Sequence, residues 1–383
     1  MSLTLENIAT RIGDQYRIKP THVTLHAGHF NVLLGATGSG KTSLMKIMAG
    51  LTPPAQGEIF LKGKNITHLP PQKRQISLVH QFFVNYPHMS VFDNIASPLR
   101  VARMNKDDIT RRVHETADML QLRELLPRMP HELSGGQQQR TALARAIVKQ
   151  SEVIFLDEPL ANLDYKLREE LRDQLPDFFA DRGTIVVYAT SEPEEALELG
   201  GAVALLTDGT IQQFGPTIEV YQNPQTVKAA DIFSSPPMNK MTVHKNTGRI
   251  ECPGGLVFDV PAHTADLADG SYILGLRPYH LLPVPQAPVR LEGIIQVTEL
   301  SGSQSCAHFS LHSSQGVAKS EASDTFPAPP ALPDAHDNWV SLYSGALSYD
   351  IGARHDFYFD PAGCFFFYPD GRRADSGNHL KGS

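Results

Sequence analysis

Cysteine is scarce in this 383-residue sequence, which carries only Cys252, Cys306 and Cys364, far apart along the chain. An odd number without close spacing predicts neither a disulfide framework nor a Cys-x-x-Cys metal site, and it suits a reducing cytosol. The sixteen histidines show no spacing typical of metal ligands either. The composition therefore argues against the disulfide-rich secreted class.

Long apolar runs and basic runs are also lacking. No stretch reaches 18 consecutive apolar residues, so no segment is expected to span a membrane, and the N-terminus lacks the apolar core of a signal peptide. The formal net charge of −7, without a run of five basic residues, argues against binding to nucleic acid phosphates. With 41% apolar residues, the composition is that of a globular protein of two or three domains.

A phosphate-binding pattern lies near the N-terminus. The stretch Gly35-Ala36-Thr37-Gly38-Ser39-Gly40-Lys41-Thr42 fits G-x-x-x-x-G-K-[ST], with an apolar strand before it and a helical run, Ser43 to Ala49, after it. Loop N–H groups and the first helical turn would point at a phosphate anion. Lys41 would reach the β- and γ-phosphates, and the Thr42 hydroxyl would bind Mg²⁺. The alternative is a chance glycine-rich turn, but the strand–loop–helix context favours nucleotide binding.

Two further stretches contain residues suited to metal binding, proton transfer or anion binding. The apolar run from Val153 ends in Asp157 and Glu158, so a buried strand would deliver two carboxylates to the edge of a sheet beside the phosphate loop. Asp157 would hold Mg²⁺ through its waters and Glu158 would accept a proton from an attacking water. The alternative is a solvated acid pair. Ser134-Gly135-Gly136-Gln137 fits a capping box at a helix start, or an anion site at that helix N-terminus.

With these motifs in order, the chain resembles the ATP-binding subunits of ABC transporters. Leu133–Gln137 matches the family's signature sequence. The resemblance implies a head-to-tail dimer, in which this signature acts on the ATP held by the partner's phosphate loop. Gln81 matches a glutamine that senses Mg²⁺ and the attacking water and that links the site to the coupling helix of the membrane subunits. Asp164, in Ala161-Asn162-Leu163-Asp164, matches an aspartate that crosses the dimer interface.

Alternating strand and helix patterns predict an α/β domain over residues 1–235, with a mainly parallel sheet and a helical subdomain inserted at about 82–140. From 236 to 375 short strands among many prolines and glycines predict a small β-barrel or sandwich, and 376–383 a disordered tail. Gly275-Leu276-Arg277-Pro278 and Phe357–Pro361 resemble the oligonucleotide-fold accessory domain of carbohydrate importers of the maltose type. The resemblance covers about residues 2–372.

The sequence departs from the family at two site positions. Ser191 stands where the family places a histidine that contacts the γ-phosphate. A serine is shorter and uncharged. It would either replace this contact or cap the next helix, as Ser191–Glu194 fits a capping box. In either case, ATP hydrolysis at this chain's phosphate loop is expected to be slower than in a subunit that has the histidine. Ile12 holds the place of the aromatic residue that stacks on adenine, with Tyr16 as an alternative contact.

The expected function is therefore an ATPase subunit that uses ATP and Mg²⁺ to energise an importer for a polyol or sugar, with glycerol as the expected cargo. Tyr188–Ala196 and Asp164–Glu170 resemble ATPase subunits of glycerol importers. The expected partners are a second, non-identical ATPase subunit, two permease subunits and, indirectly, a periplasmic solute-binding protein, at the cytoplasmic face of the membrane. The alternatives are a regulatory subunit with little hydrolysis at its own site, and an ABC ATPase that acts on nucleic acid or ribosomes.

Overall fold

The computed structural model describes residues 1–82, 84–161, 163–180, 183–301, 303–311 and 338–374. The chain separates into two compact units, Met1–Val220 and Tyr221–Ser383, which are described in turn. The tail expected at 376–383 lies outside the described residues. Within them, no helix has both the length and the apolar character that a membrane crossing requires.

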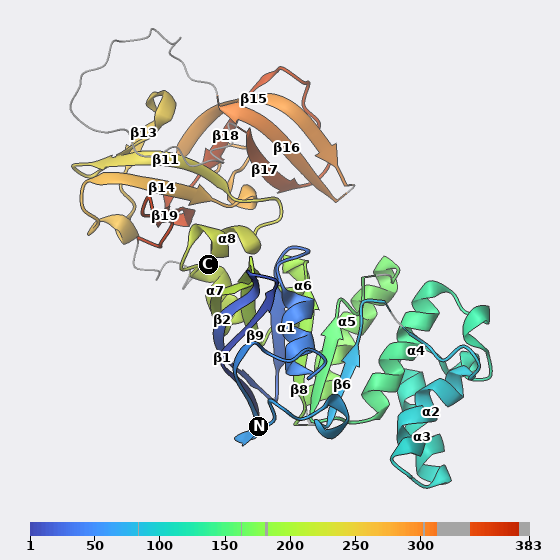
Figure 1. The fold of residues 1–383 in the computed structure, drawn as a ribbon. Helices are drawn as coiled ribbons and strands as arrows, with labels where there is room; N and C mark the ends of the chain where they lie inside the picture. The colour runs from blue at the N-terminus through green and yellow to red at the C-terminus, as the bar shows by residue number, and fades with distance from the viewer. Residues whose placement is uncertain (83, 162, 181–182, 302, 312–337, 375–383) are drawn as a thin grey trace. The chain divides into compact units, whose positions relative to one another are not determined.

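The first unit is built around a six-stranded sheet (Figure 1). In spatial order its strands are β10 (Thr210–Pro216), β9 (Ala202–Thr207), β3 (Phe30–Leu34), β8 (Ile185–Thr190), β7 (Val153–Asp157) and β6 (Ile76–Val79). All neighbours are parallel except the edge pair β10–β9. The predicted mainly parallel sheet is confirmed, and its central strands are continuous apolar runs because both faces are covered.

A second, antiparallel sheet lies over one face of this unit. It has the order β2 (Gln15–His26), β1 (Ser2–Ile12), β4 (Gln56–Leu61) and β5 (Lys64–Asn65). One hydrophobic core joins alternate residues of β1 and β4, the apolar face of helix α1 (Lys41–Met48), and one face of the parallel sheet. Helix α1 therefore packs between the two sheets with the phosphate-binding pattern at its N-terminus.

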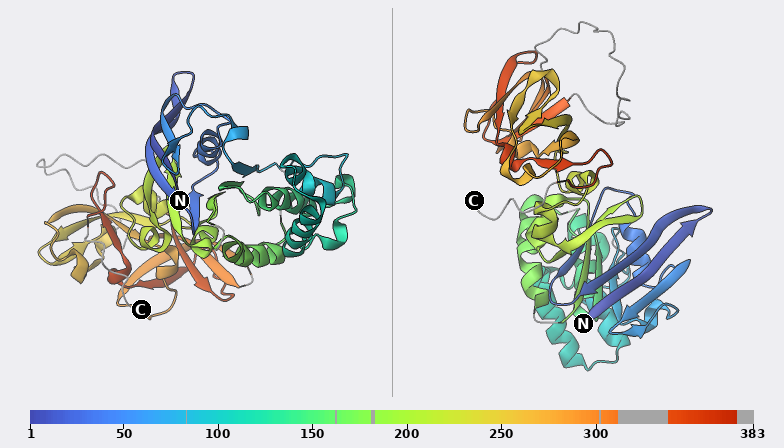
Figure 2. Two further views of the ribbon diagram at one scale, coloured as in Figure 1. Left: turned by 90° about the horizontal axis from the view of Figure 1, so that it is seen from below. Right: turned by 90° about the vertical axis from the view of Figure 1, so that its left-hand side faces the viewer.

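Helices complete the first unit. Helices α2 (Val91–Val101), α3 (Lys106–Met119) and α4 (Gly135–Val148) pack together as a helical subdomain at one end of the unit (Figures 1 and 2). The N-cap of helix α3 is Asn105, whose side chain accepts a hydrogen bond from the Asp108 N–H. The remaining helices are α5 (Tyr165–Ala180), α6 (Pro193–Leu199) and α7 (Thr217–Gln222), the last ending across the unit boundary.

The second unit consists of two antiparallel sheets and helix α8 (Val227–Ile232). The first sheet has the order β13 (Val257–Asp259), β12 (Arg249–Glu251), β11 (Asn239–Asn246), β14 (Gly270–Leu276) and β19 (Phe365–Phe367). The second has the order β17 (Asn338–Ser344), β16 (Gln304–Leu311), β15 (Val289–Leu300) and β18 (Arg354–Phe359). Both sheets contribute to one hydrophobic core that includes the stacked rings of Phe309 and Phe357. This antiparallel architecture fits the accessory domain expected from the sequence.

The second unit takes in residues before 236, the start predicted from the sequence. Ala230 of α8 packs with Met238, Ile273 and Phe367 in a small cluster of that unit, and Arg277, fully buried at the end of β14, lies 3.7 Å over the ring of Tyr221. The domain boundary itself stays a prediction.

Candidate functional site

The phosphate loop runs from the end of β3 to the start of α1. Its backbone turns through positive φ values of 86° at Gly38 and 112° at Gly40, a region that favours glycine, and Gly40 occupies the N-cap of α1. A Cβ atom on Gly35 would lie 2.2 Å from the Leu206 carbonyl oxygen of the neighbouring strand. Ala36, Thr37 and Gly38 are exposed. The loop backbone thus packs closely against β9, and its exposed part leaves N–H groups accessible to a phosphate.

Lys41 lies inside this loop. Its side chain is 5% exposed, and its Nζ donates to the carbonyl oxygens of Gly35, at 2.6 Å, and Ala36, at 3.2 Å. Burial lowers the pKa of Lys41, and the nearby carboxylates of Glu158 and Asp157 counteract this shift. The nearest of their oxygens, Glu158 Oε1, lies 3.8 Å from Nζ. A partly desolvated cation at a helix N-terminus interacts strongly with phosphate oxygens.

Oxygen ligands suited to a hard divalent cation meet beside the loop. The Thr42 hydroxyl, at the start of α1, donates to Asp157 Oδ1, at the end of β7, over 3.1 Å. Asp157 is buried and its oxygen faces the loop because β7 ends at the same edge of the sheet as β3. A hydroxyl and a carboxylate in this arrangement fit Mg²⁺, which prefers oxygen ligands and keeps several waters.

Glu158 turns back toward Lys41 through an unusual backbone conformation. Its φ is 48°, a region that costs a non-glycine residue free energy and that recurs at functional sites. The Glu158 N–H donates to the Ala189 carbonyl of β8, which fixes the turn. Gln81, just after β6, donates from Nε2 to Glu158 Oε2 over 2.8 Å. A general-base candidate and a polar amide thus face each other beside the phosphate loop.

The signature residues lie elsewhere in the first unit. Ser134 caps α4, its Oγ accepts from the Gln137 N–H, and the Gln137 side chain accepts from the Ser134 N–H, so the predicted capping box is formed. Ser134 and Gly135 are exposed, and α4 belongs to the helical subdomain, away from α1 (Figures 1 and 2). Asp164 is exposed too and accepts from the Leu167 N–H near the start of α5. Asn162 lies outside the described residues.

The capping box predicted at Ser191 is wrong. Helix α6 begins with Pro193 at its first position, so Glu192 takes the N-cap, where no side chain caps the helix. The residue before a proline is biased to extended backbone, and Glu192 has φ −97° and ψ 114°. The Glu192 N–H bonds instead to the Thr190 hydroxyl over 3.0 Å. Ser191 is exposed, one residue from Thr190, whose carbonyl accepts from the Gly35 N–H of the loop.

The two candidates for adenine contact lie on opposite faces of the β1–β2 hairpin. Arg11 pairs with Tyr16 and Ile12 pairs with Gln15, so alternation places the Tyr16 side chain on the other face from that of Ile12. The Arg11 guanidinium lies 4.2 Å over the Tyr16 ring and donates to its hydroxyl. Ile12 is 71% exposed at the hairpin tip. A base that contacts one of these side chains is therefore not expected to contact the other.

Three residues that support the site were missed from the sequence. Arg17 of β2 donates to the hydroxyl of Ser43, next to the loop threonine, over 3.1 Å. Gln139, buried in α4, donates to the Pro159 carbonyl over 2.6 Å and so ties the signature helix to the segment that follows Glu158. Gln139 could have been recognised in the sequence as a polar residue on the apolar face of a helix. Arg74, the third, is buried and donates to the carbonyl oxygens of Ile47 and Met48 of α1, which are distant from it in sequence.

Comparisons with known proteins agree with this geometry. The family model described as ABC transporter matches residues 18–161. The chain is 38% identical, over 80% of its length and 86% of the relative's, to an sn-glycerol-3-phosphate import ATP-binding protein, UgpC, of Ruegeria pomeroyi. It is 32% identical, over 97% of its length and 96% of the relative's, to a maltose/maltodextrin import ATP-binding protein, MalK, of Photorhabdus laumondii.

A solved structure shares the fold of the first unit. It is the dimeric, post-hydrolysis state of the ATP-binding cassette MJ0796 bound to ADP and Pi, with a TM-score of 0.52 and 27% identity, and the match covers 56% of this chain and 98% of that one. Relatives above 30% identity extend over most of the chain, so they include the second unit as well as the nucleotide site. The chain therefore belongs to the ABC transporter family, as a nucleotide-binding ATPase subunit of an importer.

Proposed function

We propose that this chain hydrolyses ATP at a site made by its own phosphate loop, with Glu158 as general base, and so energises the import of a polyol or sugar. The observation that carries the proposal is the meeting of Lys41, Glu158 and Gln81, from three separate segments, at one edge of the parallel sheet. Parallel strands bring their carboxyl ends to the same edge, where ligands of open α/β sheets bind.

Each residue has a role that follows from its position. Lys41 and the loop N–H groups neutralise charge on the transferring phosphoryl group, and this stabilisation is strong because the loop is partly desolvated. Glu158 accepts the proton of the attacking water, and Gln81, bound to the same carboxylate, orients both. Thr42 and Asp157 would hold Mg²⁺, which supplies further positive charge at the β- and γ-phosphates.

A dimer is part of the proposal. The signature residues Ser134–Gln137 and Asp164 are not at the chain's own phosphate loop, and Ser134 and Asp164 are exposed. A second ATPase subunit that faces this one head to tail would bring its signature to the ATP bound here, and this chain's signature to the other ATP. The MJ0796 structure is a dimer, which supports this arrangement.

The permease partners would dock beside Gln81 at the cytoplasmic face of the membrane. Phe82 and Val84, two large apolar residues that follow Gln81, are 82% and 65% exposed. A neighbouring hollow of about 320 Å³ is lined by residues of β6, α2, α4 and this loop, including Tyr86, Val101 and Arg145. A coupling helix that inserts there would act on Gln81, and through Gln81 on Glu158.

Glycerol is the first cargo to test, with glycerol 3-phosphate and maltose as competitors. The Tyr188–Ala196 stretch resembles glycerol importer subunits, whereas the two curated relatives are named for glycerol 3-phosphate and for maltose or maltodextrin import. The solute would be bound by other subunits, so the test is uptake by the importer reconstituted with its permeases and binding protein. Stimulation of ATPase turnover by one solute of the three identifies the cargo.

The catalytic assignment is tested by Glu158→Gln in the assembled complex. Loss of a general base should reduce turnover by at least about 100-fold while ATP binding is retained. Glu152→Gln is the matched control, because Glu152 is an exposed residue paired with Lys62 on the surface, and it should keep full turnover. Turnover of Glu158→Gln within about threefold of the unchanged protein would contradict the assignment.

A second candidate is a regulatory subunit whose site binds ATP but cleaves it slowly. The observation that favours it is Ser191, which lies next to the loop contact of Thr190 and does not cap α6. Ser191→His should then raise turnover at this site, because an imidazole reaches further and donates a stronger hydrogen bond to the γ-phosphate. Unchanged turnover of the complex with Ser191→His would refute the idea that Ser191 limits hydrolysis.

A further inference from the structure

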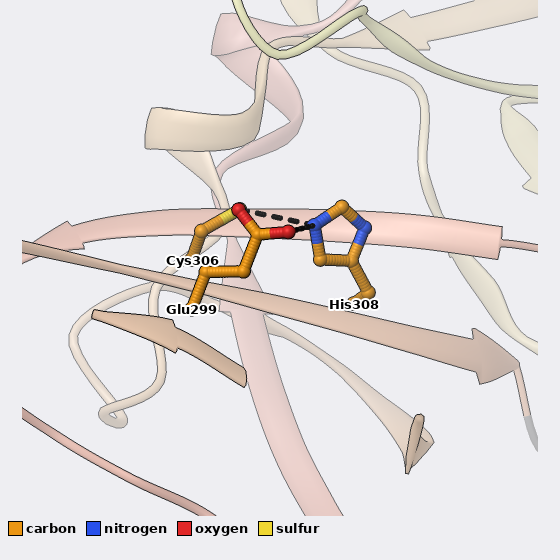
Figure 3. A group of neighbouring side chains, drawn as sticks. All are labelled: Glu299, Cys306 and His308. Carbon is orange, nitrogen blue, oxygen red and sulfur yellow. Dashed lines mark hydrogen bonds and ion pairs between the residues drawn. The ribbon is translucent and has the colours of Figure 1, made fainter. Parts of the chain in front are cut away.

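Three side chains with metal-binding atoms gather on the β15–β16 hairpin of the second unit (Figure 3). Glu299 of β15 is paired directly with Cys306 of β16, and His308 follows Cys306 by two residues. Because side chains alternate along a strand, all three project from the same face of the hairpin. The neighbouring residues Ala307 and Phe309 project to the opposite face, which is the hydrophobic core. The cluster is thus separate from the nucleotide site.

The ligand atoms are spaced for a tetrahedral ion. Cys306 Sγ lies 3.5 Å from His308 Nε2, which lies 3.8 Å from Glu299 Oε1, and all three ligand atoms are within 4.8 Å of one another. Zinc bonds of usual length at tetrahedral angles would separate such atoms by roughly 3.3 to 3.6 Å. The sulfur–nitrogen distance already fits. The Glu299 side chain is 69% exposed and can close the remaining gap by a change of rotamer.

The simpler reading is a thiol–imidazole hydrogen bond beside an exposed ion pair. His308 Nε2 faces both the sulfur and the carboxylate, however, and a neutral imidazole nitrogen carries either one proton or one lone pair. This nitrogen can donate to the Glu299 carboxylate or accept from the Cys306 thiol, but it cannot do both at once. A cation at the centre of the three atoms would satisfy all of them, since thiolate, imidazole and carboxylate are all zinc ligands.

We propose that Glu299, Cys306 and His308 bind a divalent transition metal of the zinc class, with a fourth position left to water. Binding replaces the thiol proton by a metal–sulfur bond, so one proton is released for each ion bound. Burial raises the pKa of the Cys306 thiol to about 11, so the metal-free thiol carries that proton at neutral pH. The ion would link β15 to β16 near the end of the hairpin and stiffen this part of the accessory domain.

Cobalt(II) is the probe, because a thiolate bound to it gives a charge-transfer band that histidine-only or carboxylate-only binding does not. The full chain, freed of metal by a chelator and assayed without nucleotide, should bind one Co²⁺ with this band, and Zn²⁺ should abolish it. Cys306→Ala should remove the band. His308→Ala and Glu299→Gln should weaken binding, the former by more than roughly 100-fold, since even outer-shell changes cost 10- to 100-fold.

Two matched variants serve as controls. Cys252→Ala removes a buried cysteine that directly follows β12, and His244→Ala removes an exposed histidine of β11, so both should keep the band. Far-UV circular dichroism of each metal-free variant establishes that it is folded, and Glu299→Gln, at an exposed position, carries the test if Cys306→Ala does not fold. Absence of the band in the unchanged chain, or its survival in Cys306→Ala, would overturn the proposal.

Discussion

Arg74 stabilises the helix that carries the phosphate loop, and its removal gives a sharp test of this structure. The side chain is 2% exposed and donates to four carbonyl oxygens: Leu69 at 2.7 Å, Thr67 at 2.7 Å, Met48 at 2.9 Å and Ile47 at 3.3 Å. The last two belong to the C-terminal turn of α1, where carbonyl groups lose their regular helical partners and favour a positive charge, although the Ile47 carbonyl also accepts from the Gly50 N–H. Burial lowers the pKa of Arg74, and none of the described carboxylates forms an ion pair with it.

Arg74→Ala should lower the free energy of unfolding of the first unit by about 3 to 5 kcal/mol. A hydrogen bond to a charged group contributes about 1.5 to 3 kcal/mol, but some of the four carbonyls would regain water, so the four contributions are not fully additive. Arg74→Lys should cost about half as much, because an ammonium group donates from a single point and does not reach carbonyls on opposite sides. The packing of the guanidinium against Gly50 is lost in both variants.

Thermal unfolding followed by far-UV circular dichroism measures this change, because helices α1 to α6 lie in the first unit. In a unit of 220 residues, 1 kcal/mol corresponds to about 2 to 4 °C, so Arg74→Ala should lower Tm by at least about 6 °C. Arg100→Ala is the control, since Arg100 is half exposed in a surface ion pair with Asp93 and contributes about 0 to 1 kcal/mol. If Arg74→Ala lowers Tm no more than Arg100→Ala, the reasoning is refuted.

Two further predictions concern the sheet around the site. Gly35→Ala should abolish binding of a fluorescent ATP analogue, because the new Cβ would meet the Leu206 carbonyl oxygen at 2.2 Å and displace the loop; binding within about threefold of the unchanged protein would contradict this. Burial raises the pKa of Glu195, whose carboxyl accepts from the Tyr188 hydroxyl over 3.2 Å. Its protonated form therefore favours the folded state, and this contribution is lost as the pH rises above the ordinary glutamate range. The Tm of Glu195→Gln minus that of the unchanged protein should thus increase between about pH 4 and pH 7, and a constant difference would show that Glu195 does not titrate in this way.

Patterns of consecutive residues were the most informative part of the sequence. The phosphate loop, the acid pair at the end of β7 and the capping box at Ser134 lie in the local structures expected for them, because each is defined by neighbouring residues. The capping box expected at Ser191 failed for an equally local reason. Pro193 fixed the first position of α6, so the N-cap fell to Glu192 rather than to the serine.

Elements whose partners are distant were harder to predict. The sequence did not predict strands β10, β11 and β17, each of which forms through pairing with another strand. Arg74 showed no pattern at all, because the carbonyls that hold it come from α1 and from the segment before it. The missed residues are thus those whose role arises from contacts across the fold.

The sequence by itself indicated the family, the phosphate loop and the candidate residues for its chemistry. Only the tertiary structure decided which of them meet: parallel strands bring Gln81, Lys41 and Glu158 to one sheet edge, while the signature stays apart on α4. The register of one hairpin likewise brings Glu299 to Cys306 and His308, which no spacing in the sequence indicates. Local turns follow from neighbouring residues, whereas strand pairing and register depend on burial of the whole core.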